Sequence, residues 1–111
     1  MHLVEERIGD TIVLAPRGRV DSATSPALDE RLAGLAGAAP ALVLDFAAVD
    51  YISSIGLRVL LKAAKTAREA KTRLSIAGLQ PHVREVFDIS GFSSIFTLHP
   101  SRAVALEAVR G

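Results

Sequence analysis

The chain has 111 residues, a formal net charge of +1 and no cysteine. Its length fits one domain, and because 50% of the residues are hydrophobic but only 5% are aromatic, the core must be built from aliphatic side chains. The lack of cysteine excludes disulfides and thiolate chemistry. The balanced charge gives no reason to expect bulk attraction to nucleic acid or membrane.

Membrane targeting is not indicated either. Residues 1–6 lack the basic and then apolar order of a secretory signal, and no apolar run approaches the ~20 residues that a membrane-spanning helix needs. We expect a single soluble domain over residues 1–111 in the cytoplasm, with no membrane insertion and no direct contact with nucleic acid.

The first third of the chain predicts a hairpin and a helix. Residues 3–8 and 11–16 are strand-like runs joined by Gly9-Asp10, a pair typical of tight turns between antiparallel strands. Ser25-Pro26 is a capping residue followed by proline, which predicts the start of a helix.

The rest of the chain alternates strands and helices. In order, the pattern predicts a strand at 41–45, a helix after Ser54, a strand at 73–77, a short helix opened by Pro81 and closed by Gly91, a strand at 95–98, and a helix at 102–109 capped by Ser101. A hairpin followed by this alternation predicts an α/β fold with a mixed sheet of four to five strands and about four helices.

Residues 45–57 are the stretch of most interest, because an apolar strand is followed there by a loop and the start of a helix. Ser53 and Ser54 stand at that start. The first N–H groups of a helix have no partner within the helix and carry partial positive charge, so a serine there can cap the helix or carry a phosphate. The sequence leaves open which serine is the cap.

The helix after Ser54 has two adjoining faces. Arg58, Lys62 and Lys65 fall beside an apolar stripe at the ~100° step of an α-helix. Ser54 projects near the boundary, so an accessible hydroxyl adjoins a basic strip. The plainer interpretation is an N-cap followed by a solvated basic face. The stripe expected to point inward consists of Leu57, Leu60, Leu61, Ala64 and Ala67.

Enzyme, metal and cofactor sites find little support. A serine nucleophile elbow needs glycine on both sides, but Ile52 stands where the first glycine would be, and the only histidines are His2, His82 and His99. No His or Cys pair has metal-ligand spacing, and no glycine-rich nucleotide loop occurs. We expect no catalytic residue, no metal and no cofactor.

Asp21 is a second candidate polar position, directly after Gly18-Arg19-Val20. It could line a site. An aspartate at such a position more often closes a turn or caps a helix, and the residues alone favour that interpretation.

The sequence resembles a known family at the stretch around the two serines. Residues 49–61, Val-Asp-Tyr-Ile-Ser-Ser-Ile-Gly-Leu-Arg-Val-Leu-Leu, resemble the signature of STAS domains, and the chain looks most like the small stand-alone bacterial anti-sigma factor antagonists. Residues 18–21, 24–28, 42–46, 74–79, 83–87 and 90–92 resemble further segments of the family, so the resemblance covers nearly the whole chain.

The resemblance implies partner exchange rather than catalysis. In this family the antagonist binds an anti-sigma factor and thereby frees a sigma factor for transcription. The anti-sigma factor is also a serine/threonine kinase, its phosphorylation of the antagonist breaks the complex, and a phosphatase restores it. The register of Gly56-Leu57 implies Ser54 as the phosphorylated residue. Together with the basic strip, the resemblance gives as partner-binding residues Asp21, Ser53, Ser54, Ile55, Arg58 and Lys62.

Two positions depart from the family's commonest pattern. Ser53 stands where an aspartate is usual, and Ile55 where a small residue is usual. Ile55 is expected either to alter access of the kinase or to pack against the sheet.

An alternative function belongs to a different class of binding protein. STAS-like domains also occur beside membrane transporters and in lipid-transport assemblies, so the chain could be a scaffold or a subunit of a transport complex that is not phosphorylated.

Overall fold

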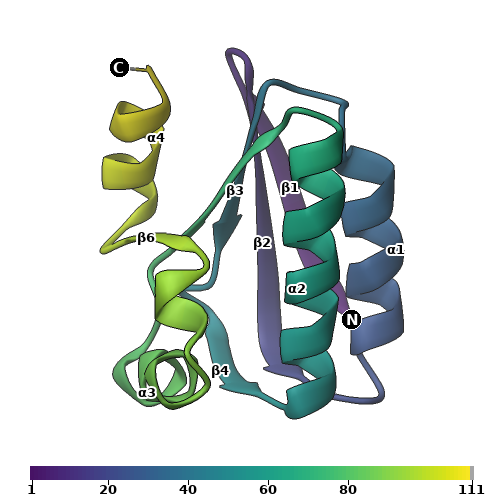
Figure 1. Cartoon of the computed structure of the whole chain (residues 1–111), viewed down its shortest axis with the longest axis vertical. Coiled ribbons are helices and arrows are strands. Elements are labelled where there is room, and N and C mark those ends of the chain that lie inside the picture. Colours follow the sequence, from purple (N-terminus) through teal and green to yellow (C-terminus); the bar gives the residue numbers. More distant parts are fainter. Residues whose placement is uncertain (111) are drawn as a thin grey trace.

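The computed structural model describes residues 1–110, which form six strands, four α-helices and one 3-10 turn (Figure 1). Within these residues, no helix combines the length and the apolar character needed to cross a membrane. In chain order the elements are β1 (His2–Ile8), β2 (Thr11–Val20), α1 (Ser25–Leu35), β3 (Ala41–Asp45), β4 (Val49–Ile52), α2 (Ser54–Glu69), β5 (Arg73–Ala77), α3 (Pro81–Ile89), η1 (Phe92–Ser94), β6 (Thr97–His99) and α4 (Arg102–Arg110).

The strands form one mixed sheet in the order β1-β2-β3-β5-β6, with β4 paired to β2 beyond the end of β3. Only β1 and β2 are antiparallel, and every other pair is parallel. The predicted α/β fold with an N-terminal hairpin and four helices is confirmed. The strand beyond the expected four to five is β4, which lies in a stretch whose sequence pattern predicts a loop.

The hairpin turns at the predicted residues. Ile8 pairs with Thr11, so Gly9 and Asp10 form a two-residue turn. Gly9 has φ +59°, whereas Asp10 is not among the residues with positive φ. A positive φ at the first central residue alone is the requirement of a type II′ turn, and glycine meets it without steric strain.

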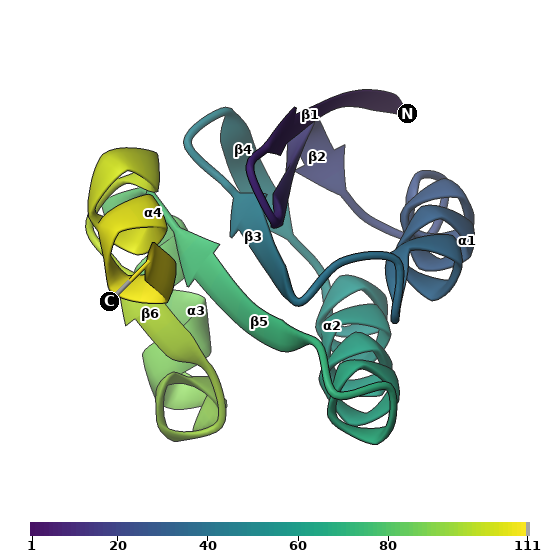
Figure 2. The same cartoon turned by 90° about the horizontal axis from the view of Figure 1, so that it is seen from above.

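Helices cover both faces of the sheet (Figure 2). The side chains of Leu42 and Leu44 join the larger core, on the side of α1 and α2. Val43 points to the opposite face, where it packs with Ala105 of α4. This explains why β3 is apolar at every position from residue 41 to 44: a strand buried on both faces has no polar side.

The C-terminal half closes one end of the larger core with aromatic side chains. Phe87 of α3 packs edge-on against Phe92, and Phe96 completes the cluster, with ring centroids 5.8 to 6.2 Å apart. Gly91, with φ +78°, ends α3 as predicted. The last strand, predicted at residues 95–98, begins two residues later, as β6 (Thr97–His99). The reason is that residues 92–94 first form a 3-10 turn, which ends at Ile95.

The last part of β2 positions the region around the two serines. The strand was expected to end at Pro16, but it continues to Val20 with a register shift between Gly18 and Arg19. It pairs first with β3 and then with β4, so that Val20 comes to lie beside Ile52. Gly18 has φ +88°, a conformation that glycine adopts readily at such an irregularity.

At Gly56, helix α2 packs closely against the ends of β2 and β4. A Cβ atom at that position would lie 2.8 Å from Cγ1 of Ile52, 2.8 Å from Cγ1 of Val20 and 3.0 Å from the Val20 carbonyl oxygen. The residue is buried and no side chain fits there. The glycine therefore fixes how the first turn of α2 sits against the sheet.

We expect Gly56→Ala to lower the free energy of unfolding by about 1–3 kcal/mol, because the added methyl group forces apart a packed core. Gly34→Ala is the matched control, since Gly34 also lies in a helix but has nothing within 4 Å of an added Cβ. That control should be stabilised by about 0.4–1 kcal/mol. Urea unfolding of both variants measures the difference, and equal stabilities would contradict the proposed close packing.

Candidate functional site

Ser53 is the cap of α2. Its backbone is extended, with φ −91° and ψ 171°, and its Oγ accepts a hydrogen bond from the Gly56 N–H at 3.2 Å. Its carbonyl oxygen accepts from the Leu57 N–H at 3.0 Å. Ser54 is the first helical residue and its side chain is exposed. The structure thus separates the two roles that the sequence left open: one serine caps, and the other presents a hydroxyl to solvent.

Two strand ends hold this helix start in place. The Ser53 N–H donates to the Val20 carbonyl at 2.9 Å, and Arg19 is in register with Tyr51 on the neighbouring strand. Figure 1 shows the result: the ends of β2 and β4 and the beginning of α2 meet at one end of the molecule, at the bottom of the view. Ser54 lies at this meeting point.

Asp21 lies in the loop after β2 and organises it. Its Oδ1 accepts from the N–H groups of Ala23 at 3.0 Å and Thr24 at 3.2 Å, and the Thr24 hydroxyl donates to the Arg19 carbonyl at 2.8 Å. These are the bonds of a turn-closing aspartate, the interpretation that the sequence favoured. The side chain is half-buried and keeps 27% of its surface exposed, so a partner can still reach it.

The same contacts set the ionisation of this carboxyl group. Desolvation by itself would raise the pKa of Asp21. The hydrogen bonds from the backbone of Thr24 and Ala23 and from the side chain of Arg19 act against it and together hold the pKa below its ordinary value. Asp21 is therefore charged at neutral pH.

The start of α1 differs from its prediction. Thr24, not Ser25, stands at the N-cap, and it makes no side-chain capping bond. Ser25 is the first helical residue and is 1% exposed, and within residues 1–110 its Oγ has no hydrogen-bond partner. Pro26 occupies the first turn as expected. Asp21 and its turn, rather than a serine cap, therefore lead the chain into α1.

Two large exposed side chains lie close to Ser54 in the sequence. Ile55 is 43% exposed and Tyr51 is 40% exposed, and the guanidinium carbon of Arg19 lies 4.1 Å from the centre of the Tyr51 ring. Ile55 therefore does not pack against the sheet, one of the two expectations for it. Sequence analysis missed Tyr51 and Arg19, because recognising them requires β4 as a strand that brings the two residues into register.

The basic strip on α2 borders a groove on the outer side of the helix, and one of its members also makes an ion pair with α1. Lys62 reaches towards α1, where its Nζ lies 3.1 Å from Oδ2 of Asp29. Arg58, Lys62 and Lys65 are all exposed and line the same groove. Leu61 was expected to point inward, but it is 44% exposed and lines the same groove.

Comparison with known proteins identifies the family of this chain. Residues 2–105 match the STAS domain. The chain belongs to the STAS family. This STAS domain is 41% identical to BtrV of Bordetella bronchiseptica, which bears the name of an anti-sigma factor antagonist, over 99% of this chain and 96% of that protein.

Solved structures agree on the fold. An anti-sigma factor antagonist from Mycobacterium paratuberculosis superposes with a TM-score of 0.90 and 27% identity, covering 99% of this chain and 94% of that one. The Bacillus cell fate determinant SpoIIAA in its phosphorylated form superposes with a TM-score of 0.76 and 18% identity, covering 97% and 99%. The second likeness shows the fold alone.

Two further polar residues near the strand ends of this STAS domain, Asp45 and His82, have structural partners. Asp45 accepts from the Ala47 N–H at 3.0 Å and pairs with Nε of Arg102 at 2.9 Å, which ties α4 to the end of β3. A ring nitrogen of His82 contacts the Asp50 carbonyl. Among residues 1–110, no cluster of three His, Cys, Asp or Glu side chains could hold a metal ion.

We expect the two neighbouring serines to differ in their effect on stability. Ser53→Ala removes the cap and should lower the free energy of unfolding by about 1 kcal/mol. Ser54→Ala serves as the matched control and should change it by less than about 0.5 kcal/mol, since its hydroxyl is exposed. Urea denaturation followed by circular dichroism measures both. A larger loss in Ser54→Ala than in Ser53→Ala would show that the roles are reversed.

Proposed function

We propose that this STAS domain is an anti-sigma factor antagonist whose binding is switched by phosphorylation of Ser54. One observation carries the proposal. At the start of α2, Ser53 makes the capping bond, and Ser54 next to it is exposed. The name of BtrV, a relative covered over nearly its full length, supports the same function.

A phosphate on Ser54 would meet a favourable local field. The first turn of α2 contains no acidic residue, so the partial positive charge of the helix N-terminus is not yet compensated there. A phosphate adds about −1.5 to −2 charge at pH 7, and a helix N-terminus can hold such an anion through its free N–H groups. Phosphorylation therefore needs no refolding of this chain.

The effect of the phosphate lies at the interface with the partner. Tyr51, three residues before Ser54, and Ile55, directly after it, offer exposed apolar surface that an unmodified antagonist can bury on binding. Adding a doubly charged group to this surface costs several kcal/mol if the partner supplies no matching cation. The unphosphorylated form binds and the phosphorylated form is released.

The partner that fits this switch is an anti-sigma factor that is also a serine/threonine kinase. It binds the unmodified surface around Asp21, Ser54, Ile55 and Arg58, and its own activity ends the complex. Lys62 is held by Asp29 at the margin of this surface, and Ser53 contributes by fixing the helix start. A phosphatase resets the antagonist. The outcome is indirect control of sigma-factor-dependent transcription in the bacterial cytoplasm, through binding and without catalysis by this chain.

Phosphate mapping tests the site. After incubation with the cognate kinase and ATP, mass spectrometry should find one phosphate on Ser54 in the wild-type chain. We expect none in Ser54→Ala, while Ser90→Ala, which removes another exposed hydroxyl at the end of α3, should be modified like the wild type. Phosphate that persists undiminished in Ser54→Ala would refute the assignment.

A phosphomimetic variant tests the switch. Ser54→Asp places a negative charge at the helix N-terminus, so its thermal midpoint should stay within a few degrees of the wild type. Its affinity for the kinase should fall by at least about tenfold, the equivalent of 1.4 kcal/mol. Isothermal titration calorimetry measures the affinity. Unchanged affinity in a folded Ser54→Asp variant argues against the switch, and an unfolded variant would show that Ser54 is structural.

A further inference from the structure

The outer side of α2 carries a groove that shares only Arg58 and Lys62 with the surface proposed for the switch at Ser54. It has a volume of about 490 Å³ and lies between α2 and the segment that follows η1. Leu61 and Ile95 are its large apolar residues, 44% and 46% exposed. Two bulky aliphatic side chains left half in water within one depression are more than the isolated exposed residues of an ordinary surface.

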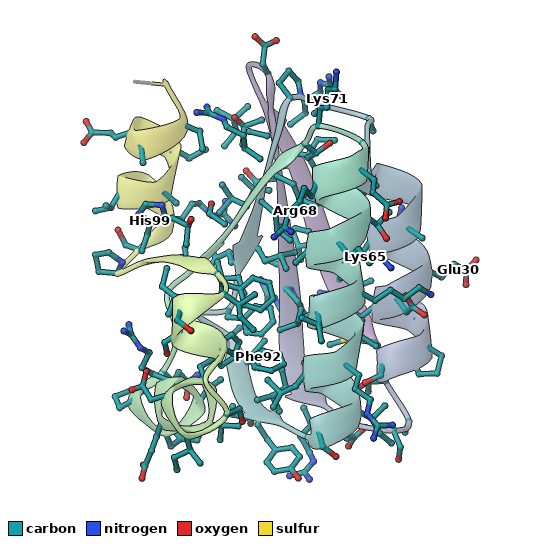
Figure 3. All side chains as sticks on the ribbon, viewed as in Figure 1. Glu30, Lys65, Arg68, Lys71, Phe92 and His99 are labelled. Carbon is teal, nitrogen blue, oxygen red and sulfur yellow. The ribbon has the colours of Figure 1, made fainter. Side chains whose placement is uncertain are left out.

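The rim of this groove is basic. Arg58, Lys62, Lys65 and Arg68 border it, and none of its lining residues is acidic. Figure 3 shows Lys65 and Arg68 on neighbouring turns of α2. Within residues 1–110, Lys62 is paired with Asp29, while Arg58, Lys65 and Arg68 take part in no ion pair.

The groove continues along α2 into a second depression. A second depression, of about 220 Å³, shares Ala64, Arg68 and Ile95 with the first and continues to Phe96 and Thr97. The basic rim runs along α2 from Arg58 to Arg68, which at 1.5 Å per residue is about 15 Å, or close to three helical turns. An apolar floor with cations along a line of this length matches one side of a partner helix.

We infer that this groove binds an acidic amphipathic helix of a partner protein. Apolar residues of that helix would cover Leu61 and Ile95, and its Asp and Glu residues would pair with Arg58, Lys65 and Arg68. The spacing of the cations on α2, at residues 58, 62, 65 and 68, follows the three- and four-residue steps of one helix face, which acidic residues on a helix packed alongside can match. The inference does not rest on phosphorylation of Ser54.

The test uses a synthetic helical peptide of about 15 residues, with Leu at every third or fourth position and Glu beside each Leu. It is titrated into the ¹⁵N-labelled full chain and followed by NMR. We expect shifts confined to the amides of residues 58–68 and the segment around Ile95. A peptide with Lys in place of Glu should not bind.

Variants then separate charge from apolar contact. Lys65→Glu combined with Arg68→Glu should weaken the peptide by at least about tenfold. Leu61→Gln, which keeps every charge, should weaken it as well, because it removes apolar surface from the floor. Arg7→Glu is the control: it makes one charge reversal of the same kind on β1, outside the groove, and should leave the affinity unchanged. All three positions on α2 are exposed, so the variants should fold.

Several outcomes would contradict binding of an acidic helix in the groove. Shifts spread over the whole basic surface, equal loss of affinity in Arg7→Glu, or equal binding of the Lys peptide would overturn the inference. Vesicles of anionic phospholipid and a DNA duplex are titrated in parallel. If either binds as tightly as the acidic peptide and is lost in the same variants, the groove is a general anion surface and the assigned occupant is wrong.

Discussion

The contact of Gly56 with the ends of two strands is the constraint on which the site depends. No Cβ fits between this residue and the side chains of Val20 and Ile52, so the first turn of α2 has one position against the sheet. Residue 54 is two positions earlier, about 200° around the helix, and therefore faces away from the sheet. The packing that buries Gly56 is thus also what presents the Ser54 hydroxyl to solvent.

Helix α2 has three surfaces with different roles. Its inner side, through Leu57 and Leu60, belongs to the core, and Lys62 ties it to α1. Its first turn holds the exposed serine, and its outer side borders the basic groove. Because the helix is a single rigid element, a protein that docks along the groove is held at a fixed distance from the serine. The two surfaces can therefore serve one partner or two.

The sequence predicted the parts of the fold in which local pattern and tertiary environment agree. β3 and β5 have the predicted limits, because short apolar runs between helix breakers have few other structures. β4 was missed because only its two end residues, Val49 and Ile52, are buried, so that its composition resembles a loop. Its strand character comes from pairing with the end of β2, a contact between distant segments that no local pattern contains.

The site shows the same limit. The resemblance to the STAS family gave Ser54 and its register, but the choice of Ser53 as the cap depends on its backbone angles and on one hydrogen bond to Gly56. Leu61 fits the inward stripe by helical periodicity and is nevertheless half in solvent, because the neighbouring element beside it is the short segment around Ile95 rather than a full helix. Helical periodicity predicts on which side of a helix a residue lies. Whether that residue is buried depends on the elements packed against that side.

The separation of the two hydroxyls also bears on how such proteins diverge. Since the capping bond comes from Ser53 and the close packing from Gly56, a single codon change at position 54 can remove or restore an exposed hydroxyl while the scaffold stays intact. Under the proposed switch, descendants of one gene can thereby become permanently engaged or reversible binders without compensating substitutions elsewhere.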